Sequence, residues 1–451
     1  MKNKNELLTG SITRALLKLS VPIVLANLLQ TAYQLTDLFW LGRLGDTAVA
    51  AVALCFPIAF FFLSLGIGLT LAGSILVAQY KGKGSQEKVD FVVGQSVALT
   101  LIAALLMSVL GYIFSPTVID LMNPEKLVAE AAVDYLHVTF IGMVFVFGFM
   151  SFQALLRGVG EVRLPALIVL GTVLLNLIVD PLFILGWGPL PALGVAGAAW
   201  ATAFTQSLAF WVALILLTKG SHGLHLRFEN LRLRFTMVKK IFALGLPSSV
   251  EMSARSLGMV MMTFLIAAFG TTVTAAYGIG HQSLSFVILP AIGLAMATTT
   301  LVGQNIGAGQ IERAEKVAQK SALLGFMILS VAGILIFLLA ELIANIFVPG
   351  EEAVIAESVT FVRIMAFSFG FLGIQKSLAG VLQGAGKTGT TMIIVIISLW
   401  VFQIPFAYFL SHYTDLGVKG LWLSIPISNV LTTVIITLVY LTGGWKKKRI
   451  T

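Results

Sequence analysis

Long apolar runs recur along the whole chain, and short polar segments separate them. A membrane-spanning helix needs about 20 mostly apolar residues, and several of these runs are longer, so we expect tilted or extended helices. The pattern predicts an all-α polytopic membrane protein with twelve spans, at residues 14–41, 47–79, 89–114, 127–156, 164–185, 193–218, 239–269, 272–304, 315–348, 353–382, 389–411 and 418–442.

The composition agrees with a bilayer rather than water as the surrounding solvent. Of 451 residues, 58% are hydrophobic and 11% are charged, whereas a soluble domain carries about 25% charged residues. The net charge of +9 comes from basic residues in short loops, which favours membrane topology over a nucleic-acid partner. The single cysteine, Cys55, excludes a disulfide within the chain and a cysteine-based metal cluster.

Basic residues are distributed unequally between the loops expected on the two sides of the membrane. Loops after even-numbered spans, together with both termini, carry 24 Lys and Arg residues, Lys376 included. Loops after odd-numbered spans carry four, which are Arg43, Lys126, Arg363 and Lys419. Because cytoplasmic loops are enriched in Lys and Arg, we expect a multi-pass protein of the cell (inner or plasma) membrane with both termini in the cytoplasm.

The chain also repeats itself at an interval of about half its length. Pro22 corresponds to Pro247, and the segment VAQYKGKG at 77–84 corresponds to VGQNIGAG at 302–309. Two halves of six spans would enter the membrane from the same side, so the repeat is parallel, and such transporters place their substrate between the halves. We expect an N-terminal half at 1–218, a basic cytoplasmic linker at 219–238 and a C-terminal half at 239–451.

Polar residues inside the first predicted span lie on one face. Asn27, Gln30, Gln34 and Asp37 occupy positions i, i+3, i+7 and i+10 of one helix, which makes a polar stripe that must face water or protein. One interpretation is a seam of hydrogen bonds between helices. The interpretation we prefer is that Asp37 couples transport to an ion, and that Asn27, Gln30 and Gln34 line a substrate cavity.

Three further groups are candidates because an ionisable residue within the membrane is costly unless it is partnered or functional. Asn176 and Asp180 lie one turn apart and could support Asp37, although Asp180 could instead be a solvated carboxylate at the mouth of the bundle. Glu251 and Arg255 have the same spacing, so they are either an internal ion pair or secondary functional residues.

His281 is the third candidate, either as a proton relay or as an ordinary hydrogen-bonded histidine. Methionines also recur on the predicted seventh span, where Met259 and Met262 could contact varied apolar ligands. Elsewhere, His222 and His225 in the linker have no accompanying cluster of carboxylates or cysteines, so we expect no metal site.

The sequence shows no enzyme-like site. The segment 384–388, GAGKT, resembles the end of a phosphate-binding loop, but Val381 stands where the motif needs its first glycine. We find no nucleophile with a base and no metal cluster, so we expect neither enzymatic activity nor a cofactor. Transport would be driven by an ion gradient or by a separate ATPase subunit.

Several motifs together resemble the multidrug and toxic compound extrusion family over nearly the whole chain. They are Pro22, the segment DLFWLGRLG at 37–45, QYKG at 79–82, QALLRGVG at 153–160 and NLIVDP at 176–181. In the DinF-like branch of this family, which the chain resembles most, residues matching Asp37, Asn176 and Asp180 are implicated in cation coupling. The sodium-coupled NorM-like branch has acidic residues in spans seven and ten. Here span ten has no carboxylate at mid-membrane, which favours proton over sodium coupling.

The resemblance implies an antiporter that exports cationic or amphipathic organic compounds by alternating access, and we expect a monomer. Two alternatives remain open at this point. A sodium-coupled exporter is one, and a lipid-linked oligosaccharide flippase of the same superfamily is the other. A flippase is expected to carry more cationic residues in its central cavity, and Arg255 is the one mid-chain cation that the predicted helices contain.

Overall fold

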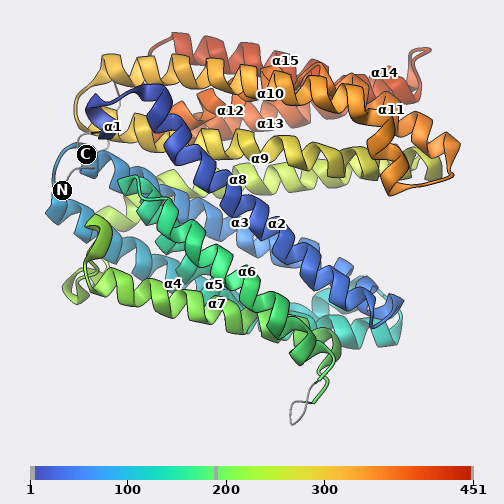
Figure 1. The fold of residues 1–451 in the computed structure, drawn as a ribbon, viewed down its shortest axis with the longest axis horizontal. Helices are drawn as coiled ribbons and strands as arrows, with labels where there is room; N and C mark the ends of the chain where they lie inside the picture. The colour runs from blue at the N-terminus through green and yellow to red at the C-terminus, as the bar shows by residue number, and fades with distance from the viewer. Residues whose placement is uncertain (1–5, 187–190, 448–451) are drawn as a thin grey trace. The chain divides into compact units, whose positions relative to one another are not determined.

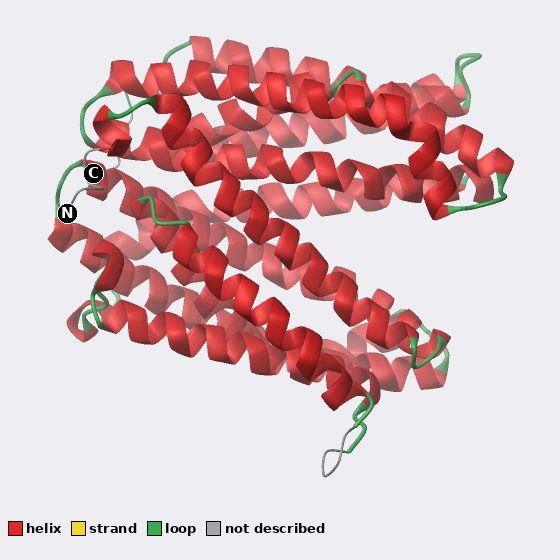
Figure 2. Cartoon of the chain, viewed as in Figure 1, coloured by secondary structure: helices red, strands yellow, loops and turns green. Residues whose placement is uncertain are grey.

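The computed structural model describes residues 6–186 and 191–447. These residues form helices joined by short loops, with no strand among them (Figure 2). The helices, labelled in Figure 1, are α1 (Glu6–Thr9), α2 (Ile12–Gly42), α3 (Asp46–Gly82), α4 (Gln86–Leu121), α5 (Lys126–Val159), α6 (Arg163–Ile184), α7 (Gly194–Thr218), η2 (Ser221–Gly223), η3 (Phe228–Leu231), α8 (Phe235–Ala267), α9 (Thr271–Gly307), α10 (Ile311–Phe347), α11 (Glu352–Ala366), α12 (Phe369–Gly384), α13 (Thr388–Ile396), η4 (Ile397–Gln403), α14 (Ile404–His412) and α15 (Val418–Leu441).

The twelve predicted spans are recovered, but the tenth is broken. Within the described residues, eleven helices are long and apolar enough to cross a membrane, and α11 with α12 makes a twelfth span that bends by 52°. The prediction of one continuous helix over 353–382 is therefore wrong. At the break, Ser368 donates its hydroxyl to the Met365 carbonyl and accepts a bond from the Asn429 amide, so side chains replace part of the interrupted backbone bonding.

The eleventh span contains a second irregularity. Residues 388–412 form α13, the π-helical segment η4 and α14 in succession. A π-helical turn widens the helix by one residue and leaves its backbone bonding irregular. The hydroxyl of Ser398, within η4, hydrogen-bonds the hydroxyls of Ser428 and Thr432 on α15.

The chain divides into two compact units. One contains 1–24 and 250–451, and the other contains 25–249. The boundaries fall inside α2 and α8, so each of these helices contributes to both units. The expected halves, which divide at the linker, differ from these units in where the first 24 residues and residues 219–249 belong.

In the unit 25–249, α5 packs against α3, α4 and α7, and α6 packs against α7. Its largest buried side chains include Phe140, Phe147 and Phe152. Close packing here depends on small residues, since a Cβ on Gly111 would lie 2.1 Å from the Phe140 ring. A smaller apolar cluster of Leu41, Ile184 and Ala198 joins α2, α6 and α7, and so fixes these three helices beside one another.

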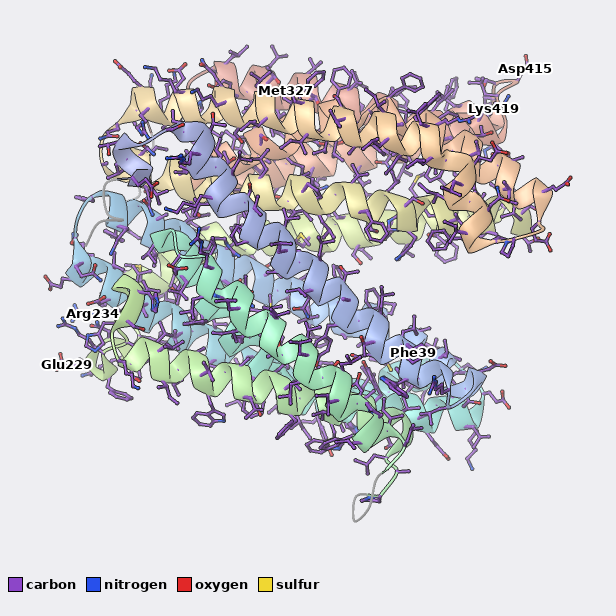
Figure 3. The ribbon with its side chains drawn as sticks, viewed as in Figure 1. Phe39, Glu229, Arg234, Met327, Asp415 and Lys419 are labelled. Atoms are coloured by element: carbon purple, nitrogen blue, oxygen red, sulfur yellow. The ribbon has the colours of Figure 1, made fainter. Side chains whose placement is uncertain are left out.

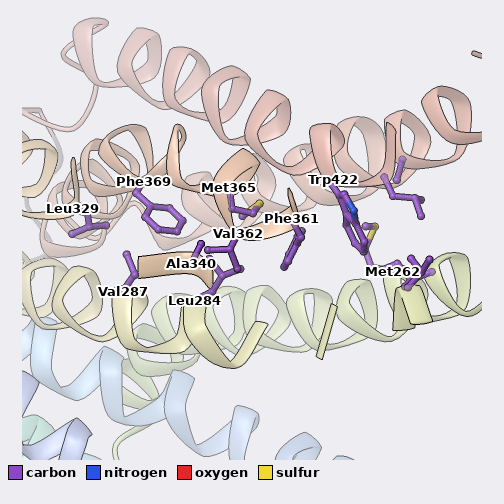
Figure 4. Packing of buried hydrophobic residues seen from close by; sticks show 14 of the residues in the cluster. Met262, Leu284, Val287, Leu329, Ala340, Phe361, Val362, Met365, Phe369 and Trp422 are labelled. Atoms are coloured by element: carbon purple, nitrogen blue, oxygen red, sulfur yellow. The ribbon is translucent and has the colours of Figure 1, made fainter. Parts of the chain in front are cut away.

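In the other unit, an apolar cluster fills the space between α9, α11 and α15 (Figure 4). Phe361 and Trp422 form its centre, with ring centroids 4.5 Å apart. The indole N–H of Trp422 donates to Glu357 Oε1 at 2.5 Å, so the polar edge of this buried ring is satisfied.

The internal repeat is visible in local geometry. Gly45 precedes α3 with φ 107° and ψ 178°, and Gly270 precedes α9 with φ 99° and ψ 175°. A side chain at either position would be strained in this region of φ. Each glycine thus starts the second span of its half in the same way, which agrees with the repeat seen in the sequence.

The linker is docked onto the end of α4. The Gln95 side chain donates to the carbonyls of Asn230 and Arg232 at 2.6 and 2.8 Å, and it accepts from the Arg234 backbone N–H at 2.7 Å. Glu229 and Arg234, labelled in Figure 3, belong to this docked segment. The linker therefore belongs to the unit 25–249.

Candidate functional site

The candidate site lies where α2, α6 and α7 meet in the unit 25–249. Asp37 projects from the second half of α2, and Thr202 on α7 donates a long hydrogen bond of 3.4 Å to its Oδ2. Asp180 and Asn176 on α6 are neighbours of the same carboxyl group. The fold therefore brings together the three residues that the sequence predicted as the coupling site.

Asn176 and Asp180 form a fully buried pair. Their side chains have 0% exposed surface, and the Asn176 amide donates to Asp180 Oδ1 at 2.7 Å. The alternative of a solvated Asp180 at the mouth of the bundle is wrong. Pro181 lies inside α6, which continues to Ile184, and Ile184 packs against Leu41 and Ala198.

Three oxygen atoms of this site have no hydrogen-bond partner among the described residues. They are Asp37 Oδ1, Asn176 Oδ1 and Asp180 Oδ2, and all three are buried. A buried acceptor without a donor costs about 1–3 kcal/mol, so such a group calls for an explanation. A proton on one carboxyl group would supply a donor, and a hard cation would be bound by oxygen atoms of this kind.

Hydroxyl groups complete the surroundings of Asp37. Tyr33, one turn earlier on α2, is hydrogen-bonded through its hydroxyl to Thr205 on α7 at 2.8 Å. The sequence pattern did not indicate Tyr33, Thr202 or Thr205 as members of the site. Threonines within helices usually bond their own backbone, as Thr205 also does to Ala201, so only the spacing of Thr202 and Thr205 on one helix face could have suggested them.

The rest of the predicted polar stripe has a different environment. Gln30 and Gln34 are exposed in the structure, and Asn27 is half-buried. None of these three side chains makes a hydrogen bond within the described parts of the chain, whereas Asp37 does. A continuous hydrogen-bonded seam therefore does not form along α2, and the role of the three amides as substrate contacts stays a prediction.

The secondary candidates lie in the other unit. Arg255 Nη2 donates to Glu251 Oε1 at 3.1 Å, so the internal ion pair is present. His281 on α9 packs against the Tyr277 ring, with centroids 5.8 Å apart, and its ring makes no hydrogen bond among the residues described. Neither group lies in the same unit as Asp37.

The two predicted methionine contacts differ in exposure. Met259 on α8 is 41% exposed, whereas Met262 is 1% exposed and belongs to the apolar cluster around Phe361. Met262 contributes to packing in this conformation. Met259 is exposed one turn beyond Arg255, and its role as a substrate contact stays a prediction.

Lys376, counted above with the cytoplasmic loops, lies inside α12, eight residues before the helix ends at Gly384. It is within electrostatic range of Arg255 and Glu251. Arg255 is therefore not the one mid-chain cation inside a helix, and the comparison with flippases that rested on this count is weakened.

Helices long and apolar enough to cross a membrane, a repeat of about half the chain and buried carboxyl groups are features typical of an integral membrane transporter. The MatE family model matches residues 22–182 and 247–409. The chain belongs to the MatE family, a class of multi-pass membrane transporters. The two matched segments begin at Pro22 and Pro247, so the family model itself finds the repeat.

The chain is similar to named bacterial proteins and to solved structures over almost its whole length. The chain is 30% identical to "Probable multidrug resistance protein YoeA" of Bacillus subtilis, over 98% of this chain and 96% of the relative. It is 27% identical to an FAD transporter of Shewanella oneidensis, over 96% and 95%. A crystal structure of MATE in complex with MaL6 superposes with a TM-score of 0.93, at 26% identity and over 100% of both chains.

Proposed function

We propose that this protein is a proton-coupled antiporter that exports cationic or amphipathic organic compounds by alternating access. Its relatives named for multidrug resistance support drug efflux. Asp37 is the coupling residue, and Asn176 and Asp180 support it. The observation that carries the proposal is the cluster of three buried, unpartnered oxygens on these side chains.

The chemistry follows from the environment of the site. Surroundings of low dielectric disfavour a charged carboxylate, so a shielded carboxyl group can hold a proton near neutral pH. A cationic compound instead favours the ionised carboxylate. Proton and substrate therefore prefer different states of one site, which is the differential affinity that exchange between them requires.

The residues of the unit 25–249 favour a cationic substrate. Asp37 and the exposed Gln30 and Gln34 on the same helix provide acidic and polar groups. We propose that the protein acts as a monomer in the cell membrane with both termini in the cytoplasm, and that it needs no cofactor.

Transport by the purified protein in proteoliposomes tests the coupling ion. Vesicles are loaded to impose either a proton gradient or a sodium gradient, and the movement of a cationic dye such as ethidium is followed by fluorescence. We expect the proton gradient alone to drive dye transport. Dye transport that follows only the sodium gradient would assign the unpartnered oxygens to a metal cation, and movement of lipid-linked sugars without dye transport would favour the flippase.

A further inference from the structure

Residues 227–240, the basic segment, are held in place by buried side chains of α4. Gln95, which makes three bonds to the segment, is 0% exposed. Asp90 is 3% exposed and pairs through Oδ2 with the Arg227 Nε at 3.8 Å. A Cβ on Gly94 would lie 2.5 Å from the Asn230 Cβ, so the segment approaches the α4 backbone closely. The outer face of the basic segment is therefore presented in a defined orientation.

Two aromatic rings project from the basic segment. Phe228 in η3 is 75% exposed, Phe235 at the start of α8 is 81% exposed, and Leu233 between them is 38% exposed. Among the described helices, η3 is not one of those long enough to cross a membrane, so the lipid tails around a span do not account for the exposure of Phe228. Because apolar surface in water is unfavourable, this ring needs an apolar partner.

The same segment carries an excess of positive charge. It contains one acidic residue, Glu229, and five basic residues. The basic side chains are all exposed, and they are Arg227, Arg232, Arg234, Lys239 and Lys240. The pairing of Arg227 with Asp90 still leaves more cations than carboxylates on this surface. Because a surface lined by one sign of charge attracts the opposite sign, the excess favours an anionic partner.

The position of the basic segment narrows the choice of partner. Phe235 begins α8, whose 33 residues exceed the roughly 20 that cross the hydrocarbon of a bilayer. Lys239 and Lys240 lie in the first two turns of this helix, where a charge is placed at the level of the head groups rather than in hydrocarbon. Aromatic rings are enriched at this boundary, and basic clusters next to a span attract anionic lipids. A surface that combines both, at the entry of a span, matches a layer of anionic lipid head groups.

We propose that the basic segment is a binding surface for anionic phospholipid head groups. Arg232 and Arg234 bind lipid phosphate groups, because a guanidinium forms two parallel hydrogen bonds to phosphate oxygens. The rings of Phe228 and Phe235 enter the region between head groups and acyl chains. Docking onto α4 fixes this surface in advance, so little conformational freedom is lost when a lipid binds. These residues are separate from Asp37, and their binding of lipid does not depend on the coupling ion.

Photo-crosslinking of the full-length protein in nanodiscs tests the proposal. The photoreactive residue p-benzoylphenylalanine replaces Phe228, the bilayer contains a minor fraction of phosphatidylglycerol in phosphatidylcholine, and mass spectrometry identifies the lipids attached at residue 228. We expect phosphatidylglycerol to exceed its bulk fraction among the adducts by about threefold or more, since each cation near the surface favours anionic lipid. Arg232→Gln combined with Arg234→Gln should lower the adducts to about the bulk ratio. Continued crosslinking to lipid by this double variant would show that it is folded and inserted.

Lys316→Gln combined with Lys320→Gln is the matched control, because both lysines are exposed on α10 and the same charge is removed from a different helix. This control should keep the enrichment of phosphatidylglycerol. Equal loss of enrichment in the two double variants would reduce the effect to net charge and overturn the proposal.

Three results from the protein that keeps all its basic residues would also overturn the proposal. Adducts at the bulk ratio would show that the surface does not select anionic lipid. The absence of lipid adducts would place Phe228 in water. Crosslinking to a second copy of the chain in place of lipid would make the exposed rings part of a protein interface.

Discussion

The amide of Asn176 donates to Asp180 Oδ1 at 2.7 Å, one turn along α6, and neither side chain has exposed surface. The bond uses one of the two carboxylate oxygens and leaves Oδ2 without a partner among the described residues. The amide thus fixes the orientation of the carboxyl group without saturating it. An oriented carboxyl group with one unpartnered oxygen beside Asp37 is suited to receive a proton.

Asp180→Asn should reduce proton-driven dye efflux about tenfold or more, since coupling free energies between sites typically correspond to about 5–150-fold effects. The amide keeps the shape of the side chain but cannot titrate, and at this buried position no water molecule can replace the carboxyl group as a proton acceptor. Asp120→Asn is the matched control, because Asp120 lies exposed on α4, and its efflux should match the wild type. Full activity of Asp180→Asn would show that Asp180 is structural.

Close backbone packing between α10 and α12 should be intolerant of side chains. A Cβ on Gly373 would lie 2.1 Å from the Gly325 carbonyl oxygen. Gly373→Val should therefore lower stability by about 1–3 kcal/mol or more, seen as a lower Tm in detergent. Gly171→Val on α6 meets no atom within 4 Å and should leave the Tm nearly unchanged. Equal loss in both variants would show that helix propensity, not packing, is responsible.

The distribution of basic residues predicts the orientation of the chain. A cysteine at Glu352 should react with a membrane-impermeant thiol reagent added outside intact cells, and a cysteine at Ser221 should react only after the cells are opened. Cys55 is buried and should contribute little background. The reverse pattern of labelling would contradict cytoplasmic termini.

The number of spans and the grouping of Asp37 with Asn176 and Asp180 could be predicted from the sequence, because apolar run length and intramembrane carboxylates are local signals. The hydroxyl groups of Tyr33, Thr202 and Thr205 could not. The break at 367–368 could not be predicted either. It falls inside a run whose hydropathy is that of a single span, and the Asn429 side chain that bonds Ser368 comes from another helix. Hydropathy along the chain does not reveal a hydrogen bond between side chains of two different helices.

Lys376 shows a second limit of the sequence. The predicted span 353–382 contained Lys376, yet the residue was counted with the cytoplasmic loops that follow even-numbered spans. The structure continues α12 past it to Gly384. Beyond Gly384, the left-handed backbone of Gly386, with φ 77°, ends the helix. A Cβ on Gly384 would lie 2.6 Å from the Thr299 carbonyl oxygen, so this end of α12 packs closely against α9.

Proton-driven dye efflux by Asp37→Asn is the most direct test of the proposed coupling. The asparagine can still accept the long bond from Thr202, but it cannot exchange a proton. In proteoliposomes that contain equal amounts of each protein, the account predicts that an imposed proton gradient drives ethidium efflux by the wild type, and that Asp37→Asn reduces it about tenfold or more. Near-normal proton-driven efflux by Asp37→Asn would contradict the account and leave Glu251 as the next candidate for the coupling residue.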